Sequence, residues 1–368
     1  MEPARLRAML ARAPGLVAGH LLACRTDPRA DPCLPADLPA RLLSLSLPAR
    51  TRAWLLRPDE RLIDSDLRWL DANGGQILAL PDADFPARIA QVPGAPATLY
   101  IAGSPQALRG AALAIVGSRQ ASAAGLDTAE QFAAELARAG LGVIGGLAEG
   151  IDTAAHEGAL ATAGHAIGVC VSGVDQAYPA RSAGLARGSA PRGCLVSPFA
   201  PGTPPRRHHF ALRTRLICAL SAGALVVEAP AGCGSLRIAQ QARRLGKPVF
   251  AVPGSIRDPQ ARGCNQLIRT GAILVQQSCE ILRELGINYI NQCLTSSPQR
   301  DLKPGPGSSL LDNKYEMLLD AAGFEPVDID VLVFRTGWSG HDVAAMLLLL
   351  ELQGRIAPRP GGRYCRLS

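Results

Sequence analysis

The sequence predicts an α/β protein built on a doubly wound, mostly parallel sheet. Uninterrupted apolar runs recur through the middle of the chain, from residues 112–116 to residues 272–275. Helical stretches lie between them, for example at residues 122–139 and 235–245. Parallel strands that are covered on both faces have continuous apolar sequences, and their alternation with helices is typical of doubly wound folds.

The strands follow one another at short intervals. We expect a short strand at residues 76–80. The predicted strands of the main sheet are residues 112–116, 141–144, 166–171, 194–196, 224–227, 248–252 and 272–275. Several end in glycine-containing loops, which in a parallel sheet meet at the carboxyl edge, where ligands bind.

Three further segments flank this sheet. Residues 1–75 have apolar residues at helical spacing and a proline-rich break near residues 28–39, so we expect a helical N-terminal region. A stretch rich in Ser, Pro and Gly predicts a linker at residues 287–310. Three helices at residues 312–322, 328–336 and 339–353, followed by a hairpin, predict a winged helix over residues 311–368. The sheet itself then occupies residues 76–286.

Composition excludes several classes of protein. The chain has 368 residues and a net charge of +7. None of the ten cysteines forms a Cys-x-x-Cys pair, no lysine precedes Ser or Thr as a P-loop requires, and no His-Glu-x-x-His is present. The apolar stretch at residues 343–350 is shorter than the ~20 residues that span a bilayer. We therefore expect a cytoplasmic protein with no metal, no cofactor and no membrane insertion.

The charge is concentrated in one segment. Residues 176–271 contain fourteen basic and two acidic residues, a net charge of +12, so the rest of the chain is mildly acidic. Such a one-sided basic segment favours a site for a polyanion. The alternative is that these arginines coat exposed helices and pair with acids from elsewhere in the chain.

The first candidate loop follows the strand at residues 112–116. Gly117 lets a ligand approach the backbone, and the amides of the next helix are expected to accept an anion. Ser118 adds a hydroxyl group and Arg119 a bidentate donor for phosphate.

The second candidate loop follows the next strand. Gly145 and Gly146 are expected to leave room for a phosphate at the same sheet edge. Asp152 and His156 stand four residues apart, so they could face one another on a helix. A catalytic acid–base pair is one interpretation, and we favour a structural pair in which each side chain satisfies the other.

A third motif combines cations with one aromatic ring. The stretch from Arg206 to Arg215 holds four arginines, two histidines and Phe210, with no acid. If a helix begins near Phe210, Arg207 lies at its positive end, where phosphates are favoured. Phe210 offers a ring on which a base could stack, or it is a core residue. The predicted binding residues are Gly117, Ser118, Arg119, Gly145, Gly146, Arg207, Phe210, Arg213 and Arg215.

These motifs, in this order, resemble the DNA-processing protein A family (DprA, also called Smf). The resemblance rests on Ala-Ile-Val-Gly-Ser-Arg at 114–119, Gly-Leu-Ala-x-Gly-Ile-Asp-x-x-Ala-His at 146–156, Phe-x-x-Arg-x-Arg at 210–215 and Val-Phe-Ala-Val-Pro-Gly at 249–254. It implies an extended Rossmann-like fold with a sterile-alpha-motif-like N-terminal region. It also implies a homodimer without established enzyme activity that binds single-stranded DNA and loads a RecA-type recombinase in natural transformation.

The chain departs from the family pattern at two pocket positions. Glu149 stands where the family usually has Arg, and Thr214 where it usually has Asn. The alternative function is a nucleoside-monophosphate phosphoribohydrolase-like enzyme. That class needs a glutamate in the loop that corresponds to residues 230–238, and the loop has none. A nicotinamide-dependent oxidoreductase fits less well, because no Gly-x-Gly-x-x-Gly follows the first main strand.

The third helix of the predicted winged helix lacks cations. Residues 339–353 contain no Arg or Lys, although a helix that reads DNA needs donors for base edges and phosphates. We therefore expect residues 311–368 to act mainly in protein interaction or regulation.

Overall fold

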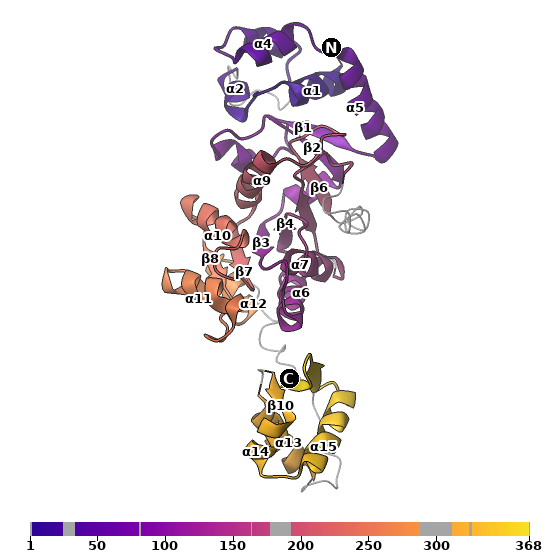
Figure 1. Cartoon of the computed structure of the whole chain (residues 1–368). Helices are drawn as coiled ribbons and strands as arrows, with labels where there is room; N and C mark the ends of the chain where they lie inside the picture. Colours follow the sequence, from indigo (N-terminus) through magenta and orange to yellow (C-terminus); the bar gives the residue numbers. More distant parts are fainter. Residues whose placement is uncertain are drawn as a thin grey trace. The chain divides into compact units, whose positions relative to one another are not determined.

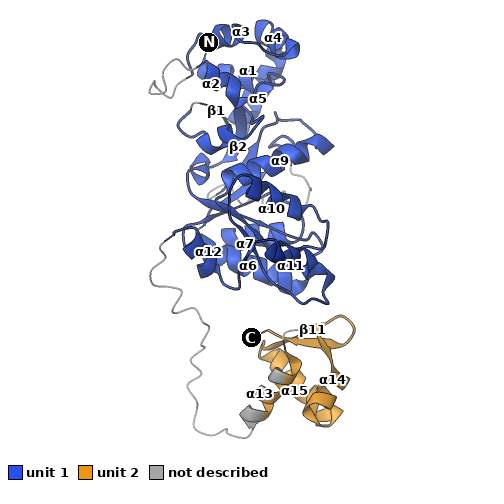
Figure 2. Ribbon diagram, turned by 90° about the vertical axis from the view of Figure 1, so that its left-hand side faces the viewer, with its two compact units in different colours: residues 1–293 blue, residues 294–368 orange. Residues whose placement is uncertain are grey.

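The computed structural model describes residues 2–24, 34–80, 82–162, 164–176, 193–287, 311–323 and 326–367. The chain forms two compact units, Met1–Cys293 and Leu294–Ser368 (Figure 2). The boundary expected at residue 75 falls inside the first unit and stays a prediction. The expected linker lies outside the described residues from residue 288 onward.

A nine-stranded sheet forms the centre of the first unit (Figure 1), in the order β1-β2-β6-β5-β4-β3-β7-β8-β9. The strands are β1 (Gln76–Ala79), β2 (Thr98–Gly103), β3 (Ala112–Val116), β4 (Gly142–Gly145), β5 (Ala166–Val169), β6 (Cys194–Ser197), β7 (Gly223–Val226), β8 (Val249–Ala251) and β9 (Ile273–Leu274). All pairs from β6 to β9 along this order are parallel, and β2 joins β6 antiparallel. The predicted doubly wound, Rossmann-like α/β fold is confirmed.

Helices cover both faces of the sheet, which explains the continuous apolar runs. In β3, Ala114 packs in the core beneath α9 (Arg207–Leu220) and α10 (Ser235–Arg244). Its neighbour Ile115 points to the opposite face and packs with Phe132 of α6 (Ala123–Arg138). Helices α7 (Ile151–Leu160) and α12 (Ser278–Glu284) share the face of α6, whereas α11 (Arg262–Arg269) lies on the face of α10.

The predicted helical N-terminal region packs on the antiparallel edge of the sheet. It consists of α1 (Pro3–Arg12), α2 (Ala18–Ala23), α3 (Leu38–Leu43), α4 (Ala49–Leu56) and α5 (Glu60–Asn73). Arg12 of α1 donates two hydrogen bonds, of 2.7 and 2.6 Å, to the buried carboxylate of Asp66 in α5. Tyr100 of β2 donates a third, of 2.7 Å. This network joins two helices and the sheet, so the region shares one core with β2.

The second unit is the predicted winged helix. Its helices are α13 (Leu311–Ala322), α14 (Ile329–Thr336) and α15 (Gly340–Leu352). The strands β10 (Val327–Asp328), β11 (Ile356–Arg359) and β12 (Arg363–Arg366) form an antiparallel sheet in the order β10-β12-β11. Within the described ranges of the whole chain, no helix has both the length and the apolar character needed to cross a bilayer.

Candidate nucleic-acid interface

The candidate site of the first unit lies where the direction of the sheet reverses. From β3 the chain continues through β4, β5 and β6 to one side, and then returns to place β7, β8 and β9 on the other. Ligands of open α/β sheets bind at this point, outside the carboxyl ends of the strands. A cavity of about 1320 Å³ occupies it, bounded by the loops after β3, β4 and β7 and by α9 and α10.

Arginines dominate the walls of this cavity, which we call the arginine cleft. Six of them line it: Arg119, Arg207, Arg213, Arg215, Arg237 and Arg244. Among the described lining residues, the acids are Glu149 and Asp152. The cavity is therefore strongly positive and fits an anionic ligand.

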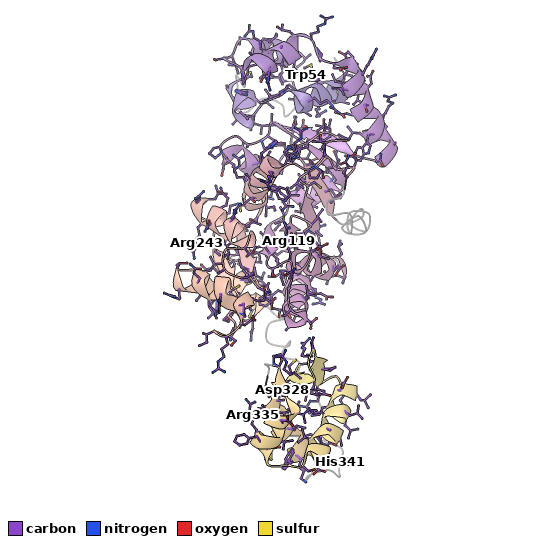
Figure 3. The ribbon with its side chains drawn as sticks, viewed as in Figure 1. Trp54, Arg119, Arg243, Asp328, Arg335 and His341 are labelled. Carbon is purple, nitrogen blue, oxygen red and sulfur yellow. The ribbon has the colours of Figure 1, made fainter. Side chains whose placement is uncertain are left out.

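The loop after β3 lies at the centre of the cleft. Gly117, Ser118 and Arg119 all line the cavity, and Arg119 is labelled in Figure 3. The amide of Ser118 donates a hydrogen bond of 2.6 Å to the carbonyl of Glu228, which fixes the turn against the β7 loop. Arg119 is exposed and makes no hydrogen bond or ion pair with the described residues, so its guanidinium is available to a ligand.

A carboxylate of the protein lies at the start of α6, where an anion site is expected. The Glu228 carboxylate accepts hydrogen bonds from the amide of Ser122 at 2.9 Å and from its hydroxyl at 2.5 Å. Ser122 is the N-cap of α6, so Glu228 supplies the negative charge that this helix end favours. Glu228 thus occupies the amide and hydroxyl of the N-cap residue, and anion binding by the amides of α6 itself stays a prediction.

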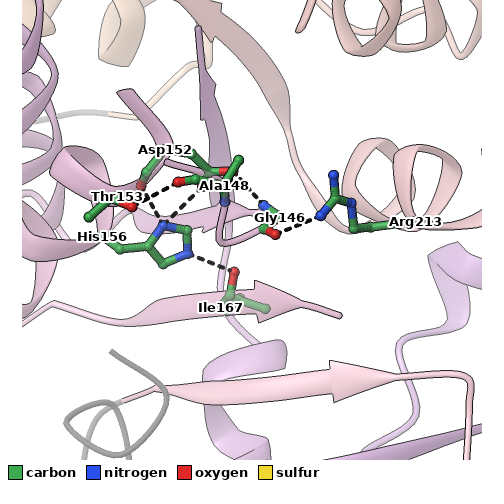
Figure 4. A network of polar contacts seen from close by, with 7 residues as sticks. All are labelled: Gly146, Ala148, Asp152, Thr153, His156, Ile167 and Arg213. Atoms are coloured by element: carbon green, nitrogen blue, oxygen red, sulfur yellow. Dashed lines mark hydrogen bonds and ion pairs between the residues drawn. The ribbon is translucent and has the colours of Figure 1, made fainter. Parts of the chain in front are cut away.

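Asp152 and His156 form a buried ion pair beneath the cleft (Figure 4). Nδ1 of His156 lies 3.1 Å from Oδ1 of Asp152 and 2.7 Å from the Asp152 carbonyl oxygen, and Nε2 lies 3.2 Å from the carbonyl oxygen of Ile167. All of these partners are acceptors, an arrangement that an imidazole with a proton on both ring nitrogens satisfies. The other carboxylate oxygen of Asp152 accepts from the amides of Gly146 and Ala148.

The protonation states agree with this geometry. Burial disfavours the charged imidazole, yet the hydrogen bond and charge of Asp152 raise the pKa of His156 above its usual value. Burial also opposes the charge of Asp152, but His156 and two backbone amides hold the pKa of this carboxyl below its usual value. Only 1% of His156 is exposed. A pair held in this way stabilises the β4–α7 loop.

Gly145 and Gly146 make room for these side chains. A Cβ at Gly145 would overlap Asp152 and His156, and one at Gly146 would lie 2.7 Å from the guanidinium carbon of Arg213. Arg213 donates a hydrogen bond of 2.7 Å to the carbonyl of Gly146. Gly146 lines the cleft, whereas Gly145 is buried behind it. The space expected for a phosphate is thus filled by Asp152, His156 and Arg213.

Helix α9 brings cations and an aromatic ring to the opposite wall. It begins at Arg207, three residues before the expected start, so Arg206 is its N-cap and Arg207 its first residue. Arg207 is exposed on the cleft, and Phe210 is half-buried with the Arg213 guanidinium 5.0 Å from its ring centroid. Arg215 also lines the cleft, but it donates to the carbonyl of Pro93 at 2.9 Å and so braces the segment before β2.

Sequence reasoning missed the contribution of α10. Arg237, Gln241 and Arg244 of this helix line the cleft. Their spacing of four and three residues places them on one helix face, directly after a glycine loop. That spacing was the signal available in the sequence. Arg237 and Arg244 raise the number of exposed arginines in the cleft from two to four.

Comparisons with known proteins agree with this architecture. Residues 76–286 match the family model for DNA recombination-mediator protein A, and residues 303–362 match that for the DprA winged helix domain. Protein Smf of Escherichia coli strain K12 is 37% identical over 308 residues, covering 83% of this chain and 81% of that protein. DNA processing protein DprA of Bacillus subtilis strain 168 is 35% identical, covering 58% of this chain and 72% of the relative.

Two solved structures share the fold. That of DNA processing protein A from Streptococcus pneumoniae has a TM-score of 0.63 and 28% identity, covering 76% of this chain and 96% of that one. The structure of the Helicobacter pylori protein, which concerns its single-stranded DNA binding mode, has a TM-score of 0.52 and 26% identity. It covers 57% of this chain and 95% of that one. The family model alone spans more than half of the chain. This chain belongs to the DNA-processing protein A (DprA/Smf) family.

Proposed function

We propose that this protein binds single-stranded DNA in the arginine cleft through phosphate contacts that depend little on the base sequence. The observation that carries the proposal is the lining of the cavity, with six arginines and only two acids at the carboxyl edge of the sheet. Exposed Arg119 and Arg207 would contact phosphates, and Phe210 would offer a ring to a base. The structure of the Helicobacter pylori relative, which concerns its single-stranded DNA binding mode, supports the same ligand.

A single strand suits this cleft better than a mononucleotide cofactor does. Cations come from the β3 loop, α9 and α10, so they are spread over several elements rather than focused on one phosphate position. The helix end that would anchor a pyrophosphate already holds Glu228. Distributed cations beside an aromatic ring are typical of proteins that follow a nucleic-acid backbone.

Family membership extends the proposal to a pathway role. We infer that the protein acts as a homodimer in the cytoplasm, protects incoming single strands during natural transformation and loads a RecA-type recombinase onto them. An order-of-addition experiment tests the last step. The protein should shorten the lag before the recombinase assembles on single-stranded DNA, and an unchanged lag would contradict a loading role.

We propose that the protein is not a nucleotide-hydrolysing enzyme. Asp152 and His156 are engaged with each other and with the backbone, and the described loop after β7 offers no glutamate at residues 230–238. Incubation with nucleoside monophosphates should release no free base. Steady release that Asp152→Ala abolishes would favour the phosphoribohydrolase-like alternative.

A further inference from the structure

Glu149 sets one part of the arginine cleft apart from the rest. It is exposed on the cavity wall, whereas the other lining acid, Asp152, is 7% exposed and paired with His156. A carboxylate repels phosphate, so its presence in a phosphate-binding cavity lowers the affinity for a DNA backbone. Its chemistry instead suits a ligand group that donates hydrogen bonds.

The backbone around Glu149 is held in place. The amide of Ala148 donates to Oδ2 of Asp152 at 3.2 Å, and the carbonyl of Ala148 accepts from the hydroxyl of Thr153 at 2.7 Å. These bonds fix the turn to the first residues of α7. The side chain therefore projects from a defined position, as a specificity-determining group requires.

This turn lies between the two groups expected to hold a nucleotide. On one side, the amide of Ile151 donates to the carbonyl of Ser118 at 3.2 Å, next to Arg119. On the other side, Arg213, which lies over the Phe210 ring, donates to the carbonyl of Gly146. Glu149, Phe210 and Arg119 all line the same cavity, so a base beside Phe210 whose phosphate contacts Arg119 lies in the space that Glu149 borders.

Bases differ in what they offer a carboxylate. Guanine presents N1–H and N2–H side by side, and the two oxygens of a carboxylate can accept both. Thymine has one N–H between two carbonyl oxygens, and adenine and cytosine have one amino group beside an acceptor nitrogen. In a single strand these edges are free of base pairing and can be read by side chains. A carboxylate has about four acceptor positions, so contacts of Glu149 within the protein leave capacity for a base.

We propose that Glu149 accepts hydrogen bonds from N1–H and N2–H of a guanine in the arginine cleft and gives the protein a preference for guanine-containing single strands. This inference rests on the proposed function and adds a base preference to it. The phosphate contacts do not depend on the base sequence. The discrimination between guanine-containing and other strands therefore comes from a single base position.

Fluorescence anisotropy with the full-length protein tests the proposal. The probes are a short labelled oligothymidylate and the same strand with one central guanine, hypoxanthine or 7-deazaguanine. We expect the guanine strand to bind about tenfold more tightly than oligothymidylate, as one bidentate base contact provides. The 7-deazaguanine strand, which keeps both donors, should match guanine. Hypoxanthine lacks the N2 amine and should lose most of the preference.

Two variants assign the preference to this side chain. Glu149→Ala should bind oligothymidylate somewhat more tightly, because a negative charge has left the cleft, and should bind all strands equally. Glu157→Ala is the matched control, since it removes an exposed carboxylate from α7 outside the cleft. It should keep the guanine preference.

The outcomes separate this inference from the proposed function. Equal affinity of the wild-type protein for the guanine and thymine strands overturns the guanine preference and leaves DNA binding intact. A preference that persists in Glu149→Ala overturns the assignment to Glu149. Absence of binding to every strand overturns the proposed function, and the inference falls with it.

Discussion

The arginine cleft and helix α15 occupy the two places where these folds ordinarily hold a ligand. The cleft lies at the carboxyl edge of the doubly wound sheet, and α15 is the third helix of the winged helix, the element that reads DNA in helix-turn-helix proteins. Six arginines line the cleft, whereas α15 contains no Arg or Lys. Both places are ligand sites in proteins of these folds, but only the cleft has the positive charge that a polyanion needs.

Helix α15 is apolar on two opposite faces. Val343, Leu347 and Leu350 are buried in the core of the second unit. On the other face, 59% of Leu348 and 78% of Leu352 are exposed. A surface helix normally has one apolar stripe, and a second exposed stripe is typical of a protein-interaction site. The difference between the regions supports the prediction that the second unit acts in protein contacts.

The largest expected effect comes from breaking the ion pair that supports the cleft. Asp152→Asn leaves a protonated His156 buried without its counter-charge, and the free energy of unfolding should fall by about 3–5 kcal/mol. Chemical denaturation followed by circular dichroism measures this. Glu157→Gln, on an exposed site of the same helix, is the control and should change stability by less than about 0.5 kcal/mol. A small effect of Asp152→Asn would show that the pair is not a structural support.

The next effect concerns the cleft arginines. Arg119→Ala and Arg207→Ala should each weaken single-stranded DNA binding by roughly 1.5–3 kcal/mol, because each removes a charge-assisted phosphate contact. Both side chains are exposed, so the thermal unfolding midpoint should not change. Arg257→Ala removes an exposed arginine outside the cleft lining and should bind normally. Unchanged affinity in both cleft variants would remove the assignment of the site.

The pH dependence of stability should report the raised pKa of His156. A group whose pKa is raised by folding stabilises the protein fully below its unfolded value of about 6.5, and this contribution is lost as the pH rises through the folded value. Between wild type and His156→Gln, the difference in unfolding free energy should therefore shrink above about pH 6.5, by at most about 1.4 kcal/mol per pH unit. A difference that is constant or grows with pH would contradict a protonated His156.

The smallest effect is expected from removing the second unit. A protein truncated after Gly307 should bind single-stranded DNA within about threefold of the full chain, under roughly 0.7 kcal/mol. Anisotropy titration of both proteins against one oligonucleotide measures the change. A much larger loss, in a truncated protein that keeps its circular dichroism spectrum, would make the winged helix a DNA-binding domain and remove the contrast with the cleft.

Much of the fold follows from local sequence. The apolar runs predicted β3 to β8 because each of these strands is buried. The run at residues 272–275 also predicted β9, although 45% of Leu274 is exposed in this edge strand. The glycine loops predicted which sheet edge carries the site. The start of α9 was placed three residues late, since Arg207 has no sequence feature that distinguishes a first helical residue from the preceding loop. The apolar pattern begins only after Arg206 and Arg207, and it therefore predicts a helix start near Phe210.

The interior of the site could not be predicted in the same way. Glu228 caps α6 from 106 residues away in sequence, and Arg213 fills the space above Gly146 from another element. Both contacts depend on the packing of distant segments, which spacing along the chain does not reveal. The sequence therefore predicts the glycines as sites of close approach, and it does not show which protein side chains approach them.

The central claim is that the arginine cleft binds single-stranded DNA through its phosphates. Its most direct test is a salt titration of the full-length protein with a single-stranded oligonucleotide and with the corresponding duplex. We expect tighter binding to the single strand and a log–log slope of about −0.7 for each phosphate neutralised, less steep in Arg119→Ala by about one such contact. A slope near zero, or a clear preference for the duplex, would contradict the account.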